Sequence, residues 1–167
     1  MAAEKLIFVP DKYLGQHVAR QTGKDMIFWE GFCPVHMRIL PEYIEEMKKR
    51  HPGAEVLVHP ECTIETTGRA DKVLSTTGMC RYVANSHARE FIIGTEEGIL
   101  HRMRKDNPGK SFYPATDLAV CENMKKNSLE KVLASLEEMK NVVTVKEEIR
   151  QKAYHAIAKM LDYSRAD

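Results

Sequence analysis

Five short segments contain the side chains that could carry chemistry, and they read GFCPVH, HPEC, STTG, GTEEG and AVCENM. They supply thiols, imidazoles, carboxylates and hydroxyls, and each follows an apolar run of strand length. In parallel α/β sheets, ligands bind at the carboxyl ends of the strands, where loops and helix N-termini provide hydrogen-bond donors. We therefore predict that all five segments lie along one edge of one sheet.

The four cysteines, at positions 33, 62, 80 and 121, are too few and too widely spaced for a small disulfide scaffold. The sequence contains no C-x-x-C pair, which argues against a zinc ribbon or a thioredoxin-type site built from local sequence. A metal site in this chain must therefore gather cysteines that are distant in sequence. The cysteine usage also favours a reducing compartment.

Charge and hydropathy exclude several kinds of partner. The 25 Lys and Arg against 24 Asp and Glu leave a formal charge of +1, so no net field favours nucleic acid or anionic lipid. No apolar run approaches the roughly 20 residues of a membrane span, and the first ten residues show neither a basic leader nor a cleavage site. We expect a cytoplasmic protein that binds neither nucleic acid nor membrane.

Strand patterns alternate with helical patterns along most of the chain. This alternation predicts an α/β fold in which a parallel sheet is sandwiched between helices. The segment LIFVP has the form of a buried strand, and we assign Phe28, Trp29 and Tyr82 to the core. Strands are predicted within 6–10, 25–32, 54–62, 71–78, 90–98 and 110–124, and helices within 13–23, 41–53, 64–70, 79–88, 98–109, 129–141 and 145–163.

An internal repeat is visible when IFVPDKYLG is aligned with FIIGTEEGI, which places Val9 against Ile93 at an offset of 84. The next strand in each copy leads to a cysteine, and 121 − 33 = 88, so the offset is nearly kept. We therefore predict that 1–33 is the tail of one α/β unit, that 34–121 is a complete unit, and that 122–167 adds C-terminal helices. The apolar faces of those helices need a surface to cover.

The order of motifs resembles the quinolinate synthase family across essentially all 167 residues. The segments that carry the resemblance are GFCPVH, RHPGAEVLVHPEC, ADKVLSTTGMCRYV, EFIIGTEEGILHRMRKDNPGKSFYP and VCENMKKNSLEKVLASLE. The resemblance implies three similar α/β sandwich units around a pseudo-threefold axis. It also implies a 4Fe-4S cluster held by one cysteine from each unit. The implied activity is the transferase reaction that condenses iminoaspartate with dihydroxyacetone phosphate to quinolinate in NAD biosynthesis.

By this resemblance Cys33 and Cys121 match two of the three cluster cysteines, and the third is not in this chain. Thiolates suit such a site because sulfur is a soft, anionic donor. His36 matches an active-site histidine that could orient substrate or transfer protons near neutral pH. Composition alone would make either cysteine a buried free thiol and the histidine an ordinary loop residue.

The HPE segment matches the family's substrate site. His59 and Glu61 match residues that bind substrate carboxylate, and Glu61 is the candidate acid-base, while Pro60 would only fix the loop. Ser75 and Thr76 fall where the family binds the carboxylate or phosphate of the substrate, although simple helix capping would explain them too.

The remaining polar loop residues are assigned structural roles. Cys62 and Cys80 do not match ligand positions and are interpreted as structural, although Cys62 follows the HPE segment directly. Residues 95–98 have the form of a helix cap, and no catalytic role is assigned to them.

The resemblance also implies an N-terminal unit that would supply the first cysteine and a substrate-stacking tyrosine. We therefore expect the chain to act with such a unit or through self-association, and to be weakly active or inactive as a monomer. Two other functions stay open. One is a non-catalytic α/β module that binds a dicarboxylate, a phosphate or a partner subunit without a cluster. The other is a zinc or iron protein that uses Cys33, Cys121 and His36.

Overall fold

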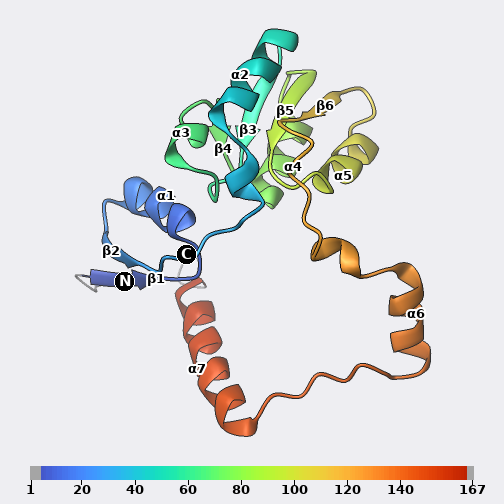
Figure 1. Cartoon of the computed structure of the whole chain (residues 1–167). Helices are drawn as coiled ribbons and strands as arrows, with labels where there is room; N and C mark the ends of the chain where they lie inside the picture. The colour runs from blue at the N-terminus through green and yellow to red at the C-terminus, as the bar shows by residue number, and fades with distance from the viewer. Residues whose placement is uncertain (1–4, 165–167) are drawn as a thin grey trace. The chain divides into compact units, whose positions relative to one another are not determined.

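The computed structural model describes residues 5–164, which divide into two compact units, one ending at Glu122 and the other beginning at Asn123. Every strand pair in the described residues is parallel, and helices flank the strands, so the predicted α/β architecture is confirmed (Figure 1). The unit boundaries drawn from the sequence repeat and the threefold arrangement stay predictions. No helix in the described part of the chain is long and apolar enough to cross a membrane.

A four-stranded sheet forms the centre of the first unit. Its strand order is β4-β3-β5-β6, with β3 at Glu55–Val58, β4 at Lys72–Val73, β5 at Glu90–Gly94 and β6 at Ser111–Pro114. The two central strands are apolar on both faces, as expected where helices cover both sides of a parallel sheet.

Consecutive residues of the central strands feed two separate cores. Val58 belongs to one cluster of buried residues and Leu57 to the other, because side chains alternate across a strand. Helix α2, Pro41–Arg50, covers the first cluster, while α4, Thr76–Asn85, and α5, Ile99–Asp106, cover the second. The predicted sandwich is therefore present around this sheet.

A smaller element precedes the sheet and consists of β1, Lys5–Phe8, helix α1, Lys12–Thr22, and β2, Asp25–Phe28. The two strands pair in parallel, and α1 ends at Gly23 in the left-handed conformation, as predicted. A Cβ atom on Gly15 would lie 2.7 Å from the ring of Phe28 and 2.8 Å from that of Phe8. Glycine at this position therefore lets α1 lie directly on the two strands.

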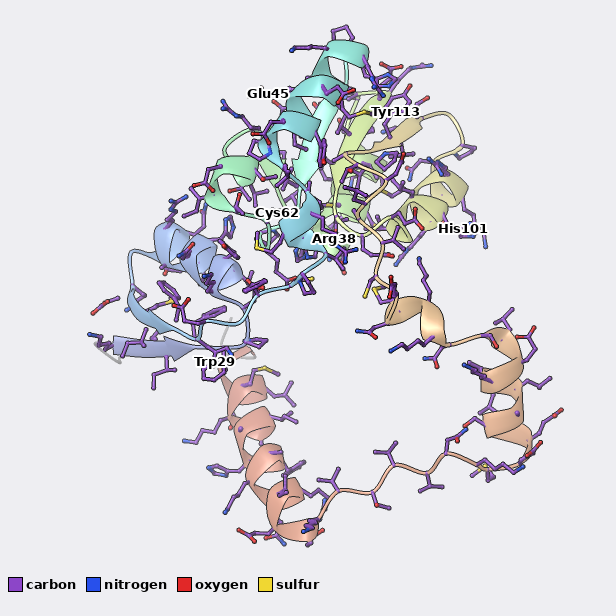
Figure 2. The ribbon with its side chains drawn as sticks, in the orientation of Figure 1. Trp29, Arg38, Glu45, Cys62, His101 and Tyr113 are labelled. Carbon is purple, nitrogen blue, oxygen red and sulfur yellow. The ribbon has the colours of Figure 1, made fainter. Side chains whose placement is uncertain are left out.

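Two core assignments in this element are wrong. Ile7 is 77% exposed and Val9 is also exposed, although LIFVP was expected to be a buried strand. Trp29, labelled in Figure 2, is 63% exposed rather than part of the core. The reason is that a two-stranded sheet with one helix covers only the face that carries Phe8 and Phe28.

Several element boundaries also differ from the predictions. Strands β2 and β6 end at Phe28 and Pro114, so Cys33 and Cys121 follow irregular segments rather than the strands themselves. Helix α4 begins at Thr76, three residues before its predicted start, because Ser75 caps it. Two short elements complete the unit, the 3-10 turn η1 at His36–Arg38 and helix α3 at Ile64–Thr67.

Helices and one turn are the regular elements of the second unit within its described residues, 123–164, and 138–146 are irregular. The unit contains the turn η2 at Met124–Lys126, helix α6 at Leu129–Glu137 and helix α7 at Glu147–Ser164, which confirms the two predicted helices. Within this unit the apolar side of α6 is exposed, including Leu129 and Leu136.

Candidate active site

Two loops of the first unit bring four of the predicted site residues together, namely Cys33, His36, His59 and Glu61. The turn η1 places His36, and it is closed by the amide of Met37, which donates to the carbonyl of Cys33 at 3.2 Å. The loop after β3 carries His59, whose amide donates to the carbonyl of Gly94 at 2.9 Å. Because β3 and β5 are neighbours, their carboxyl ends meet at the same edge of the sheet.

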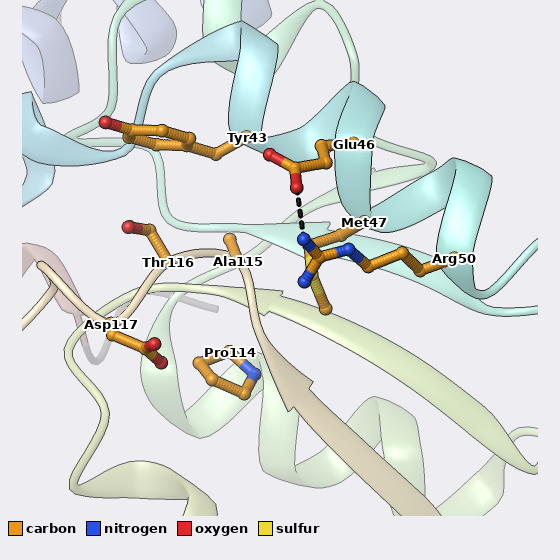
Figure 3. A pocket seen from close by; sticks show the side chains of 8 residues that line it. All are labelled: Tyr43, Glu46, Met47, Arg50, Pro114, Ala115, Thr116 and Asp117. Carbon is orange, nitrogen blue, oxygen red and sulfur yellow. Dashed lines mark hydrogen bonds and ion pairs between the residues drawn. The ribbon is translucent and has the colours of Figure 1, made fainter.

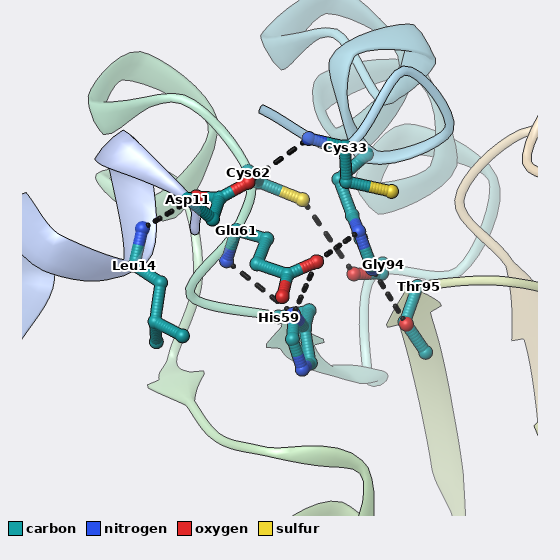
Figure 4. A network of polar contacts seen from close by, with 9 residues as sticks. Asp11, Leu14, Cys33, His59, Glu61, Cys62, Gly94 and Thr95 are labelled. Carbon is teal, nitrogen blue, oxygen red and sulfur yellow. Dashed lines mark hydrogen bonds and ion pairs between the residues drawn. The ribbon is translucent and has the colours of Figure 1, made fainter. Parts of the chain in front are cut away.

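The centre of the site is a group formed by Cys33, His36 and Glu61. One potential ligand atom from each of these residues lies within 4.8 Å of the other two. His36 Nδ1 and Glu61 Oε2 lie 3.0 Å apart, but they are not aligned for a hydrogen bond, so the buried Nδ1 has no hydrogen-bond partner among the described residues. Figure 4 shows Glu61 and the polar contacts around it. A buried polar atom without a partner is costly unless something binds it, which suits a ligand-binding position.

Thr95 and His59 fix the position of the His36 ring. Its Nε2 lies 2.9 Å from the hydroxyl of Thr95, and its ring stacks on that of His59 with centroids 4.5 Å apart. Burial, reinforced by the neighbouring His59, lowers the pKa of His36 to about 4. The ring is therefore neutral at pH 7, with one nitrogen able to donate and the other able to accept.

The carboxylate of Glu61 lies beside the Nδ1 atoms of both stacked histidines. Its backbone amide donates to His59 Nδ1 at 3.3 Å, and its carboxylate lies 3.9 Å from the same nitrogen. Burial and then the charge of Asp11 raise the pKa of Glu61, and burial lowers the pKa of His59. A carboxylate whose pKa is moved toward neutrality is better matched to proton transfer than an exposed one.

Cys121 lies outside the group of three. Its amide donates to Glu96 Oε1 at 3.2 Å, and its side chain packs against the same core cluster as Cys33. Both thiols are partly exposed.

The other two cysteines occupy the cores. Cys62 is buried, with Sγ 3.8 Å from the carbonyl of Gly94, and burial raises the pKa of its thiol far above the ordinary range. Such a thiol resists ionisation and is a poor metal ligand. Cys80 packs against the second core cluster, so both environments support the structural interpretation.

Ser75 and Thr76 lie at the start of α4, beyond the carboxyl end of β4. Ser75 Oγ accepts from the amide of Gly78 at 3.1 Å, which confirms the capping interpretation. Both residues are exposed, and β4 pairs with β3, so this helix start lies at the edge of the sheet that carries the HPE loop. Pro60 is buried in that loop. Substrate binding by Ser75 and Thr76 stays a prediction.

Sequence reasoning missed three residues that hold the site. Residues 95–98 were expected to form a helix cap, but it is Glu96 that binds the start of α5, by accepting the amide of Gly98 at 2.8 Å, while the hydroxyl of Thr95 contacts His36. Glu96 and Asp11 are buried carboxylates that accept the amides of Cys121 and Cys33. A weak signal was available, because an acidic residue follows each of β1 and β5 within three residues, although the repeat aligns Asp11 with Thr95 rather than with Glu96.

A separate pocket of about 380 Å³ opens between α2 and the segment after β6 (Figure 3). Its lining contains an ion pair between Arg50 and Glu46, together with Tyr43 and Asp117. None of the predicted site residues lines this pocket. The candidate site is therefore the cluster at the strand ends rather than this cavity.

Comparison with known proteins identifies the family of the chain. The sequence profile of the family described as "Quinolinate synthetase A protein" matches residues 1–162. The chain is 51% identical to the quinolinate synthase of Dehalococcoides mccartyi over 96% of its own length and 53% of that relative. It is 50% identical to quinolinate synthase 1 of Methanosarcina acetivorans, over 95% of the chain and 52% of the relative. The chain thus spans about half the length of the relatives it matches, and it belongs to the quinolinate synthase family.

Proposed function

We propose that this chain forms the C-terminal part of a quinolinate synthase, contributing to the condensation of iminoaspartate with dihydroxyacetone phosphate in NAD biosynthesis. The observation that carries the proposal is the convergence of Cys33, His36 and Glu61 within 4.8 Å. A thiol, a neutral imidazole and a carboxylate of raised pKa are the groups that a metal-assisted condensation and dehydration would use.

Cys33 and Cys121 would hold the 4Fe-4S cluster, together with a third cysteine that is not in this chain. The thiols fit this role because both are partly exposed and pack against one core cluster, so they are accessible to iron and sulfide, unlike Cys62. When bound, a cluster with one iron not ligated by protein supplies a Lewis acid for substrate oxygens.

Glu61 would act as the base for the acidic carbon protons of the substrates. Its raised pKa favours proton transfer, and His36 Nδ1, 3.0 Å away, faces the same carboxylate. The hydroxyl of Thr95 can donate to His36 Nε2 or accept from it. His36 can therefore hold or release a proton at Nδ1 while its ring keeps its position.

The anionic groups of the substrates would be bound by the surrounding residues. His59 stacks on His36 and lies beside Glu61, which suits an orienting role toward a carboxylate. Ser75 and Thr76 begin α4, where hydroxyls and backbone amides can receive a phosphate or carboxylate.

Anaerobic reconstitution with iron and sulfide tests the ligand assignment. We expect a broad visible absorption that is lost in Cys33→Ser and Cys121→Ser but kept in Cys80→Ser, the control in which a partly buried thiol of the second core is changed. Quinolinate formation is then measured for the chain alone and after mixing with the N-terminal half of a relative. No product in either case would exclude the catalytic role for this chain.

The convergence of Cys33, His36 and Glu61 also favours a second candidate, a mononuclear zinc or iron(II) site. Glu61 replaces Cys121 in the ligand set expected from the sequence. Stoichiometric zinc binding without sulfide, lost in Glu61→Gln and unchanged in Cys121→Ser, would favour this candidate over the cluster.

A further inference from the structure

The backbone around Cys33 is fixed by two hydrogen bonds from the start of α1. The amide of Cys33 donates to Asp11 Oδ2 at 2.9 Å. One residue along, the amide of Lys12 donates to the carbonyl of Gly31 at 2.9 Å, two residues before the cysteine. The carboxylate therefore accepts a hydrogen bond from the cysteine segment, and the next amide donates one to it.

The backbone around Cys121 is fixed in the same way. The amide of Cys121 donates to Glu96 Oε1 at 3.2 Å. The amide of Glu97 donates to the carbonyl of Ala119 at 3.0 Å, again one residue after the carboxylate and two before the cysteine. We call each pair of hydrogen bonds a clamp, the first made by residues 11 and 12 on 31 and 33, the second by residues 96 and 97 on 119 and 121.

Each clamp carboxylate also binds the beginning of a helix. Asp11 Oδ1 accepts from the amide of Leu14 at 2.8 Å, and Glu96 Oε2 accepts from that of Gly98 at 2.8 Å. The residues are only 4% and 8% exposed. Two buried oxygens that each accept an N–H require a carboxylate, because an amide side chain would turn an NH₂ toward one of the donors.

The clamps occupy equivalent places in the fold. Asp11 follows β1 and Glu96 follows β5, the first strand of a parallel pair, while each cysteine follows the second strand, β2 or β6. The segment from carboxylate to cysteine is 22 residues in one clamp and 25 in the other. The two strand pairs thus share individual hydrogen bonds, although one clamp uses aspartate and the other a glutamate one position later in the aligned repeat.

We propose that Asp11 and Glu96 are positioning residues, each of which holds the backbone of one ligand cysteine in place through the same clamp. The ligand role of the cysteines rests on the proposed function, whereas the clamps are a property of the polypeptide itself. Neither carboxylate needs to touch the bound group, because each acts on the amide of the residue that does.

Amide hydrogen exchange on the isotopically labelled 167-residue chain tests the clamps directly. We expect the amides of Cys33 and Cys121 to exchange slowly in the unmodified chain. In Asp11→Ser, serine can still cap α1 but is too short to reach Cys33, so Cys33 should exchange at least about tenfold faster while Cys121 is unchanged. Glu96→Gln turns an NH₂ toward one of its two donors, so faster exchange should be confined to the amides of Cys121 and Gly98 while that of Cys33 is unchanged.

Anaerobic reconstitution of the same variants tests positioning. Asp11→Ser and Glu96→Gln should each lower the visible absorption gained with iron and sulfide by at least about half, whereas Ser128→Ala, which removes the cap of α6, should not. Equal acceleration of both amides in either variant would overturn the clamps by showing general loosening. If only the amide of the clamped cysteine exchanges faster and the variant still gains the full visible absorption with iron and sulfide, the positioning role would be overturned.

The exchange result also separates this proposal from the proposed function. If the unmodified chain gains no absorption with iron and sulfide, the cluster assignment fails. The two amides then still decide whether the clamps exist. Should neither variant fold, Asp11→Asn and Glu96→Asp can replace them, because their side chains have closely related shapes. The expected result is the same, namely that only the amide of the clamped cysteine loses its protection from hydrogen exchange.

Discussion

The strand pairs β1–β2 and β5–β6 share the same hydrogen bonds to a cysteine loop but differ in how far their strands are buried. Strand β5 lies between β3 and β6 and is buried, whereas β1 pairs only with β2 and has one exposed face. Nevertheless, both pairs lead to a partly exposed cysteine whose amide is held by a buried carboxylate. The same hydrogen bonds therefore hold both cysteine loops, although the strands that lead to them differ in burial.

The difference in burial between the strand pairs predicts the largest change in the free energy of unfolding. Ile93→Ala removes a side chain that is 1% exposed, so the free energy of unfolding should fall by about 2–5 kcal/mol. Ile7→Ala removes one that is 77% exposed and should change it by less than about 0.5 kcal/mol. Urea unfolding measures both, and similar losses would show that β1 contributes to the main core.

A pH effect is expected where the two regions meet, since His36 follows Cys33 and contacts Thr95 after β5. The unfolded chain protonates this histidine near its ordinary pKa of about 6.5, but the folded chain does so only near pH 4. The unfolded state therefore binds more protons between these values, and the stability contributed by His36 is lost as the pH falls from about 6.5 to about 4. The loss should reach about 3 kcal/mol.

The difference between the unmodified chain and His36→Gln isolates this contribution, because Glu61, whose pKa is raised, acts in the opposite direction. Urea unfolding at pH 7, 6, 5 and 4 should show a shallower acid slope in His36→Gln. His101→Gln, at an exposed position on α5, is the control. An unchanged slope in His36→Gln would mean that His36 is solvated in the folded chain.

A smaller effect is expected where α1 packs on its strands. Gly15→Ala would place a Cβ atom under 3 Å from the rings of Phe8 and Phe28, so we expect a loss of about 1–2 kcal/mol despite the better helix propensity of alanine. Gly109→Ala, where no atom lies within 4 Å of the new Cβ, should be nearly neutral. Amide exchange within α1 would detect the effect, and unchanged protection there would show that the rings move aside at no cost.

The smallest effect concerns the cap of α4. Ser75→Ala should cost about 1 kcal/mol by removing the acceptor for the amide of Gly78, and Ser75→Gly only a few tenths. If Ser75 also binds substrate, both variants should weaken phosphate binding equally, as measured by calorimetry. Binding that follows the cap stability instead would assign Ser75 a structural role alone.

The sequence predicted the features that depend on neighbouring residues. The alternation of strands and helices and the end of the first helix at Gly23 were predicted, and capping was one of the two interpretations of Ser75, because each follows from signals a few residues apart. The resemblance supplied His36 and Glu61, but nothing in their spacing shows that they lie 3.0 Å apart.

What could not be predicted depends on tertiary arrangement. Asp11 reaches an amide 22 residues away, and Thr95 reaches an imidazole 59 residues away, so neither contact leaves a local signal. The exposure of Ile7 was also hidden, since an apolar strand sequence does not reveal how many neighbouring strands cover it.

Gly94, which accepts the amide of His59, limits how this site can be redesigned. A Cβ atom there would lie 2.9 Å from a methyl group of Val58, the residue directly before the HPE loop. The same carbonyl lies 3.8 Å from the thiol of Cys62. A mutational library aimed at new substrates could therefore vary the exposed Ser75 and Thr76 with the loss of no more than the α4 cap, whereas variation at Gly94 would displace the residues around the proposed base before any new specificity could be selected.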